Sequence, residues 1–368
     1  MMVMMTMTTL KPISLALLLI LTFGLLFRLK TTMSYLEIGR VWCSVNLLLP
    51  QHQPFQRDFT VGNSTLGVSG IRAGSQLLLS ADSLHPIQFG TILALSQGTQ
   101  WRIDGMRAAA HVSGIELQVP AQPGWPKQFI QAFRESGPIE AHGAAVGWLG
   151  HKELLKLVLQ SGCSSALILK DDMDWDTEIR NQTRLIAAAV RALTNEEDNG
   201  QAPYGSGWDL LWMGHCGDTA NINRPMFIFK DHTTIPPDEY RGLDRHITMI
   251  VREGERSVHY SENAACSFAY AVSAEGAEKL LYLASSGHGG AFDLMLMGAC
   301  RGKELRCVSV NPEVFDPYRP ADGELSEVQD GDRGDTLDVH VGDGMGYTDN
   351  IRQSARCLGL FNSTCYSS

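Results

Sequence analysis

From about residue 85 onward, the apolar positions of the chain switch repeatedly between two kinds of pattern. Short apolar runs with the length of buried strands lie at 86–95, 114–119, 166–169 and 208–213. Segments with apolar side chains at helical spacing lie at 101–111, 151–159, 177–193 and 277–284. Strands that alternate with helices are typical of a largely parallel sheet covered on both faces. The pattern therefore predicts an α/β domain.

The first 34 residues differ from this domain. Residues 13–27 form an uncharged apolar run between Lys11 and Arg28. The run predicts one retained signal-anchor helix, because the apolar part of a cleaved signal spans about 7–15 residues and ends at small residues. A cleaved signal peptide, which gives a secreted form, is the alternative. Basic residues flank the run on both sides, so charge alone does not orient it.

These patterns divide the chain into five parts. Residues 28–84 contain Pro and Gly without a sustained period and predict a partly ordered stem. The predicted parts are a tail at 1–12, the membrane helix at 13–27, the stem at 28–84, the main domain at 85–356 and a C-terminal tail at 357–368. Within the main domain, two segments rich in polar residues and Gly predict irregular loops, at 195–207 and at 322–349.

The charge of the chain excludes one class of partner. The formal net charge is -10, and the first 34 residues contain three basic side chains and no acid. The remainder therefore has 27 basic and 40 acidic side chains. A protein that binds the phosphate backbone needs a basic face, so we expect no nucleic-acid partner.

Eight cysteines follow the membrane signal, and none forms a Cys-X-X-Cys pair. An even number in this context predicts disulfides in an oxidising compartment, with buried free thiols as the alternative. Cys216 follows one predicted strand and Cys266 precedes another, so their Cα atoms can reach the ~4.4–6.8 Å that a disulfide needs. Cys300 and Cys307 can close a short loop.

Three Asn-X-Ser/Thr triplets begin at Asn63, Asn181 and Asn362. Such triplets accept N-linked glycans in the secretory pathway, and they are consistent with a lumenal body. Together with the cysteines and the apolar run, they predict a single-pass protein of the Golgi or endoplasmic reticulum membrane.

The candidate chemistry lies at the end of the strand at 166–169. Four carboxylates follow it within six residues, at Asp171, Asp172, Asp174 and Asp176. Ligands of open α/β sheets bind at the carboxyl ends of strands. Adjacent acids can share a hard cation that carries a diphosphate, so Asp172 and Asp174 are the predicted ligands of Mn²⁺ or Mg²⁺. Alternatively, Asp174 or Asp176 only caps the next helix.

The acid cluster is one of several ordered motifs that resemble a known family. They lie at 150–159, 164–176, 208–217, 266–281, 292–296, 310–315 and 349–352. Together they resemble glycosyltransferase family 25, the lipopolysaccharide-type glycosyltransferases, in its fungal branch. The resemblance implies a GT-A-like nucleotide-sugar-binding domain that transfers a hexose from a UDP-sugar to a glycan or glycoprotein acceptor with the help of Mn²⁺.

The resemblance also implies roles for individual residues. Asp293 matches the family's catalytic base, and His151 matches a histidine of the acceptor cleft. Arg102, with Asp171, Asp172 and Asp174, is expected to bind the nucleotide-sugar and its metal. The alternatives are a salt-bridged helix acid for Asp293 and a packed or capping residue for His151.

Two departures from the family keep a second function open. Lys170 stands where the family has Glu, and Arg102 is the residue retained from the family's Asn-Leu-X-X-Arg-X-Asp-Arg motif. An inactive transferase-like binding module is therefore the alternative to an active enzyme. A phosphohydrolase is disfavoured, because neither Asp172 nor Asp174 starts an Asp-X-Asp-X-Thr/Val sequence. Lys170 either neutralises diphosphate charge itself or lies in solvent.

Overall fold

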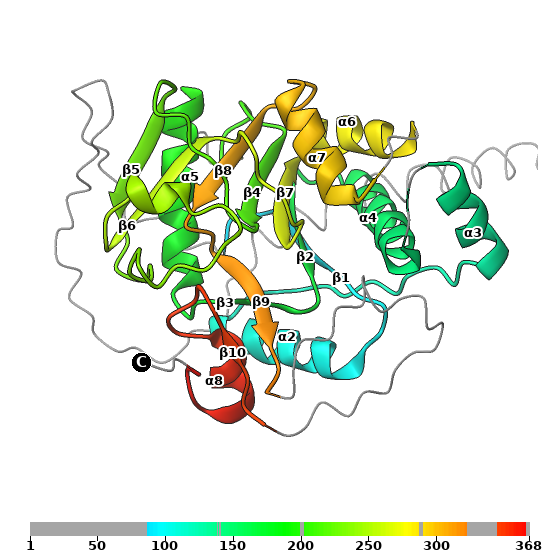
Figure 1. The fold of residues 1–368 in the computed structure, drawn as a ribbon, viewed down its shortest axis with the longest axis horizontal. Coiled ribbons are helices and arrows are strands. Elements are labelled where there is room, and N and C mark those ends of the chain that lie inside the picture. Colours follow the sequence, from blue (N-terminus) through cyan, green and yellow to red (C-terminus); the bar gives the residue numbers. More distant parts are fainter. Residues whose placement is uncertain are drawn as a thin grey trace, which may run out of the picture.

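The structure is a computed structural model that describes residues 87–137, 139, 141–198, 202–286, 290–321 and 344–365. These residues form a seven-stranded central sheet between two layers of helices, with a three-stranded sheet beside it (Figure 1). The prediction of an α/β domain is confirmed.

The central sheet is mixed rather than largely parallel. Its strands, in spatial order, are β1 (Thr91–Leu95), β2 (Ser165–Lys170), β7 (Ala269–Ser273), β4 (Leu210–Gly214), β8 (Cys307–Asn311), β6 (Glu255–Tyr260) and β5 (Met226–Lys230). The pairs β1–β2 and β4–β8 are parallel and the other four pairs are antiparallel. Five strands therefore run in one direction, and β7 and β6 run against them.

The helices cover both faces of this sheet. One layer contains α4 (His142–Ser161), α6 (Ala274–Ser285) and α7 (Phe292–Arg301), and α3 (Lys127–Glu135) packs on α4. The other layer contains α2 (Gln100–Ser113), α5 (Ile179–Thr194) and α8 (Ala355–Phe361). Side chains of β2 alternate between two cores, because successive residues of a strand point to opposite faces. Ala166 and Ile168 pack with the first layer, and Leu167 and Leu169 pack with the second.

The smaller sheet contains β10 (Tyr347–Thr348), β9 (Phe315–Arg319) and β3 (Met173–Trp175), with antiparallel pairing. Helices α2 and α8 lie side by side next to it (Figure 1). Because α8 continues to Phe361, the predicted boundary at residue 356 falls inside a helix. Residues 357–361 belong to the folded domain, which corrects the predicted C-terminal tail.

Most predicted elements appear with shifted ends. The helix expected at 151–159 starts earlier, at His142, and the strand expected at 114–119 is an extended segment with one bridge, from Gln118 to Leu93. The short η1 turn (His246–Met249) lies in a segment that the sequence pattern left unassigned.

The predicted membrane helix and stem lie outside the described residues. No helix of the part that the structure describes is both long and apolar enough to cross a bilayer.

Both predicted disulfides are confirmed. Cys216 is bonded to Cys266 and Cys300 to Cys307, with a Cα–Cα distance of 5.5 Å in each pair. A third disulfide joins Cys357 in α8 to Cys365. The described cysteines are therefore all oxidised, and none is a free thiol.

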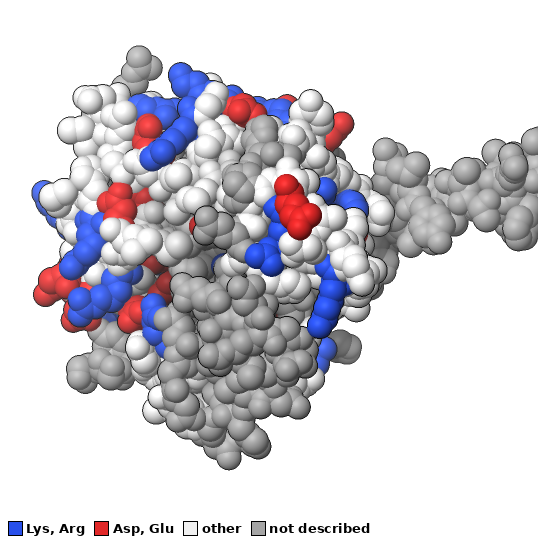
Figure 2. Space-filling model, turned by 45° about the vertical axis from the view of Figure 1, so that its right-hand side comes forward, with Lys and Arg blue, Asp and Glu red and all other residues white. Residues whose placement is uncertain are grey.

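The surface charges are interspersed on the face that Figure 2 shows. Lys and Arg side chains alternate there with Asp and Glu side chains over the described residues.

Candidate functional site

The acid cluster lies where β2 ends and the chain turns into β3. The N–H of Asp171 donates to the carbonyl of Leu95 at the end of β1, at 3.0 Å. The N–H of Lys170 donates to the carbonyl of Phe268, just before β7, also at 3.0 Å. These two bonds tie the turn to both neighbouring strands, so its side chains are presented at a fixed place on the carboxyl edge of the sheet.

Arg102 reaches this turn from α2 and pairs with both of its acids. Its Nη1 atom is 3.2 Å from Oδ1 of Asp171 and 3.3 Å from Oδ2 of Asp172. Arg102 and Asp171 are buried, with 5% and 3% of their surface exposed. The structure thus brings together Arg102, Asp171 and Asp172, three of the residues expected to bind the donor.

Asp172 has one carboxylate oxygen that the described residues leave unsatisfied. Its side chain is 25% exposed, but its Oδ1 atom is buried and accepts no hydrogen bond within the described parts of the chain. A buried acceptor without a donor is unfavourable, and a cation or donor group satisfies it. Mg²⁺-type ions bind proteins through one or two carboxylates and complete their shell with phosphates and water. The environment of Asp172 therefore fits one protein ligand of a metal–diphosphate complex.

Asp174 does not fit the metal role predicted for it. It is fully buried, and its Oδ1 atom accepts from the N–H groups of Trp175 (2.8 Å) and Arg356 (3.0 Å). Its Oδ2 atom accepts from the hydroxyls of Thr348 and Ser354. Burial raises the pKa of this carboxyl, and these four hydrogen bonds oppose the rise. Both oxygens are occupied by protein donors, so Asp174 anchors the fold rather than a metal.

Asp176 is occupied by backbone donors in front of α5, and because the N-cap residue of that helix is Glu178, neither Asp174 nor Asp176 is its cap. The Asp176 carboxylate accepts from the N–H of Glu178, just before α5, and from the N–H of Gln353. Across the described ranges, no cluster of three or more His, Cys, Asp or Glu side chains is arranged to hold a metal ion. Of the four acids, Asp171 and Asp172 remain at the site.

Arg356, which no sequence motif indicates, contacts the acid turn from the interior. Its guanidinium is fully buried and donates from Nη1 to the carbonyls of Asp171 (3.2 Å) and Met173 (3.3 Å). From Nη2 it donates to the carbonyls of Trp101 (3.3 Å) and Arg102 (3.2 Å). One side chain therefore holds the acid turn and the start of α2 in a fixed relation.

Packing around Arg356 is equally specific. Its guanidinium lies 4.8 Å from the ring centroid of Tyr318 and 5.4 Å from that of Trp101. A Cβ atom at Gly105 would overlap the guanidinium, so this glycine of α2 makes room for it. In the sequence, Gly105 is a local signal that another group approaches α2 closely, but a glycine does not identify which side chain that is.

Asp293 lies at the same sheet edge, in the first turn of α7. Its Oδ2 atom accepts from the N–H of Cys266 at 2.9 Å. Cys266 is bonded to Cys216 and precedes Phe268, whose carbonyl binds Lys170. Asp293 is half-buried and has no ion pair among the described residues, so the salt-bridged alternative does not apply.

His151 is buried instead of lining a cleft. It is 2% exposed, its Nδ1 atom is 3.0 Å from the Tyr270 hydroxyl, and its ring stacks on Phe292 at 4.1 Å between centroids. Burial, with the nearby charge of Lys170, lowers the pKa of His151 to about 3. The imidazole is therefore neutral, and its position does not fit the predicted acceptor-cleft role.

Other aromatic and basic side chains near the strand ends are buried or half-buried. Trp175, Trp208 and Trp212 are at most 1% exposed and pack in the core, so none presents a ring to a sugar. Lys170 is half-buried, with its Nζ atom 5.3 Å from the Phe268 ring centroid. His215 is fully buried beside Cys216.

Comparisons with known proteins add little to this geometry. No protein-family model and no curated protein matches the chain. Among solved structures, the chain is similar to the crystal structure of A197 from STIV, with 10% sequence identity and a TM-score of 0.31. The match covers 64% of this chain and 86% of A197. A likeness this remote carries no argument, so the function must be inferred from the chain's own residues.

Proposed function

We propose that this protein is a GT-A-like glycosyltransferase that moves a hexose from a UDP-sugar to a glycan or glycoprotein acceptor. The observation that carries the proposal is the buried, unsatisfied Oδ1 atom of Asp172 at the carboxyl end of β2. It lies where open α/β sheets bind their ligands, and it supplies the hard oxygen that a metal–diphosphate needs. One of the motifs that resemble glycosyltransferase family 25, residues 164–176, contains this turn.

On the donor side, three charged residues have distinct tasks. Asp172 would hold Mn²⁺ or Mg²⁺, and the ion supplies positive charge to the leaving diphosphate. Arg102 pairs with the other oxygen of Asp172 and keeps that carboxylate oriented. Lys170 precedes the acid pair and contributes a further positive charge near the diphosphate, in place of the acid that the family has there.

On the acceptor side, Asp293 is the proposed general base. It would take the proton from the acceptor hydroxyl as that oxygen attacks the anomeric carbon of the donor. The N–H of Cys266 binds one of its oxygens, and the disulfide to Cys216 restrains that segment. His151 is not a proton carrier in this proposal, because its pKa is too low. It supports Phe292, the residue before Asp293, by stacking.

One observation favours the alternative of an inactive binding module. Arg102 already pairs with both Asp171 and Asp172, and Asp174 is withdrawn into the interior. A site whose acids are neutralised by a protein cation can bind a ligand without a metal and without turnover.

Release of UDP from a panel of UDP-hexoses, with Mn²⁺ present, tests the proposal. We expect the full chain to release UDP, and Asp293→Asn to lower kcat by about 100-fold or more with UDP affinity retained, as for loss of a general base. Glu278→Gln is the matched control, because Glu278 is exposed on α6 and is not one of the proposed site residues.

The same assay separates the two candidates. If the protein binds UDP but releases none from any donor, the binding module replaces the enzyme. If it neither binds UDP nor turns over a donor, both candidates are wrong.

A further inference from the structure

We propose that Asn362 is a site of N-linked glycosylation that remains accessible in the folded protein, whereas Asn181 is not. Both residues begin Asn-X-Ser/Thr triplets, so sequence alone does not distinguish them. The inference rests on the conformation of each triplet and is independent of the proposed enzymatic function.

Asn362 is exposed at the C-terminal end of α8. Its backbone is left-handed, with a φ of 53°, and its N–H donates to the carbonyl of Leu358 at 3.1 Å. This conformation ends the helix, so Ser363 and Thr364 lie outside it. Within the described chain, neither the Asn362 amide nor the Thr364 hydroxyl makes a side-chain hydrogen bond that would have to break.

The loop that contains Asn362 is held at the surface by a covalent bond. The disulfide between Cys357 and Cys365 encloses the triplet, with a Cα–Cα distance of 5.7 Å. Cys357 is fully buried in the domain, while Asn362 is exposed. The folded domain therefore presents a short non-helical loop, which is the kind of segment that modifying enzymes reach.

The triplet at Asn181 is held in the opposite way. Asn181 and Thr183 lie inside α5, where residues two apart point about 200° from each other. Thr183 is fully buried, and its hydroxyl donates to the carbonyl of Ile179 at 2.8 Å. The side-chain amide oxygen of Asn181 accepts a hydrogen bond from the Arg184 guanidinium at 2.9 Å. A transferase that needs the amide and the hydroxyl together cannot engage this triplet without unwinding α5.

The reaction requires a lipid diphosphate-linked oligosaccharide as co-substrate. The amide nitrogen of Asn362 forms a bond to the anomeric carbon of the first sugar and loses a proton. The bond between that carbon and the diphosphate oxygen breaks, and the lipid diphosphate leaves. Atoms and charge balance without an oxidant or reductant.

Glycan transfer to the folded chain tests the inference. The full chain, made without glycans and with its disulfides intact, is incubated with an oligosaccharyltransferase and a lipid-linked oligosaccharide, and each site is mapped by peptide mass spectrometry. We expect glycan occupancy at Asn362 to exceed that at Asn181 by about tenfold or more, because only the triplet at Asn362 is accessible in the folded chain. Synthetic peptides that contain each triplet serve as the control for their intrinsic acceptor strength.

Three variants make the result specific. Asn362→Gln and Thr364→Ala should each abolish transfer at this loop, and Asn181→Gln should leave it unchanged. Circular dichroism shows whether each variant is folded. The proposal is overturned if the folded wild-type chain is not glycosylated at Asn362, or if Asn181 is occupied to the same extent after correction by the peptides.

Discussion

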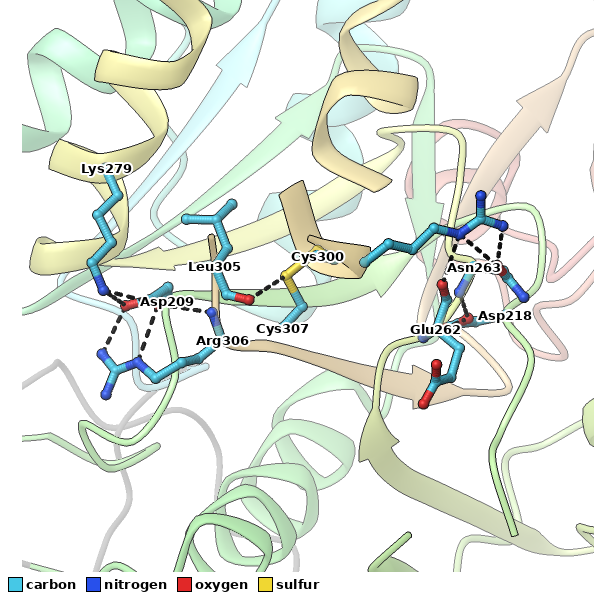
Figure 3. Close-up of a disulfide and its surroundings, with 10 residues drawn as sticks. Asp209, Asp218, Glu262, Asn263, Lys279, Cys300, Leu305, Arg306 and Cys307 are labelled. Carbon is cyan, nitrogen blue, oxygen red and sulfur yellow. Dashed lines mark hydrogen bonds and ion pairs between the residues drawn. A yellow bond between two sulfur atoms is a disulfide. The ribbon is translucent and has the colours of Figure 1, made fainter. Parts of the chain in front are cut away.

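The two edges of the central sheet each contain a carboxylate that faces an arginine, and they differ in how fully it is satisfied. At the amino edge, Asp209 precedes β4 and is 1% exposed. Both of its oxygens accept from Lys279 and from the Arg306 side chain, and one also accepts from the Arg306 N–H (Figure 3). At the carboxyl edge, Asp172 has one oxygen paired with Arg102 and one without a partner in the described chain.

The surroundings of the two acids strengthen this contrast. In Figure 3, Lys279 and Arg306 converge on Asp209 from α6 and from the loop before β8, next to the disulfide between Cys300 and Cys307. Glu275 pairs with the same two cations, at 2.7 Å and 2.9 Å. The amino edge is thus closed by ionic and covalent links. Pairing with arginine is thus common to Asp209 and Asp172, and what distinguishes Asp172 is the oxygen that the described residues leave unsatisfied.

The largest effect is expected from Arg356, which supports the acid turn at the carboxyl edge of the sheet. Arg356→Met should lower the free energy of unfolding by about 3–5 kcal/mol, because it removes a buried cation and leaves four carbonyls without their donor. Arg356→Lys keeps the charge but cannot reach all four carbonyls. Its free energy of unfolding should therefore lie between those of wild type and Arg356→Met. Urea denaturation measures both. A loss below about 1 kcal/mol for Arg356→Met would show that the carboxyl edge does not depend on this side chain.

The next largest effect is expected from Asp209, at the amino edge of the sheet. Asp209→Asn should cost about 2 kcal/mol at neutral pH, since Lys279 and Arg306 are partly exposed and solvent screens part of the loss.

The loss should also depend on pH. Burial alone would raise the pKa of Asp209, but hydrogen bonds from Arg306 and Lys279 outweigh it and lower the pKa. The acid therefore stabilises the fold above its ordinary pKa of about 3.9, and this contribution is lost as pH falls through the lowered value. The gap between wild type and variant should narrow below about pH 4. A gap that widens in acid contradicts the pairing.

Asp174→Asn should have a smaller effect on stability, and that effect should change with pH in the opposite direction to the effect of Asp209→Asn. An asparagine can accept from the N–H groups of Trp175 and Arg356 and donate to the hydroxyls of Thr348 and Ser354, so the cost at neutral pH should stay within about 1 kcal/mol. Because burial raises the pKa of Asp174, wild type should gain stability relative to the variant as pH falls from that raised value toward about 3.9. Melting temperatures from pH 4 to pH 7 check the sign, and a wild type that loses ground over this range is the contrary result.

The last expected effect is on turnover rather than on stability, and it concerns Lys170. If its charge assists the leaving diphosphate, Lys170→Glu should lower turnover by about tenfold at saturating Mn²⁺, which is about 1.4 kcal/mol. If Lys170 is instead a defect of the site, the same change adds a hard oxygen ligand, strengthens Mn²⁺ binding and raises turnover. UDP-hexose hydrolysis across a Mn²⁺ series distinguishes the two signs. No activity from either form counts for the binding module.

The local parts of the site could be predicted from the sequence. Strand β2 is a buried apolar run that leads straight into the acids, and the pairing of Cys300 with Cys307 closes a short loop. The α2 helix, which carries Arg102, shows helical spacing of its own. In each case the signal lies within a few residues of the feature.

The features that could not be predicted depend on contacts between residues that lie far apart along the chain. Asp174 is satisfied by Thr348 and Ser354, which are 174 and 180 residues away, and this pairing leaves no periodic trace near the acid cluster. Arg356 reaches Asp171 across 185 residues. The three-residue strand β3 is too short to show a period. The helix of His151 was predicted, but the burial of His151 depends on its contacts with Tyr270 and Phe292, which are more than 100 residues away.

Binding of UDP, measured by calorimetry with and without Mn²⁺, tests the central claim most directly. Wild type should bind UDP with Mn²⁺ and lose that binding on chelation. Asp172→Asn should weaken it by about 100-fold, because it removes the hard anionic ligand. The matched control is Asp174→Asn, from the same cluster, which should stay within about threefold of wild type because Asp174 is saturated by protein donors. UDP affinity that is unchanged by chelation and by Asp172→Asn would contradict the account.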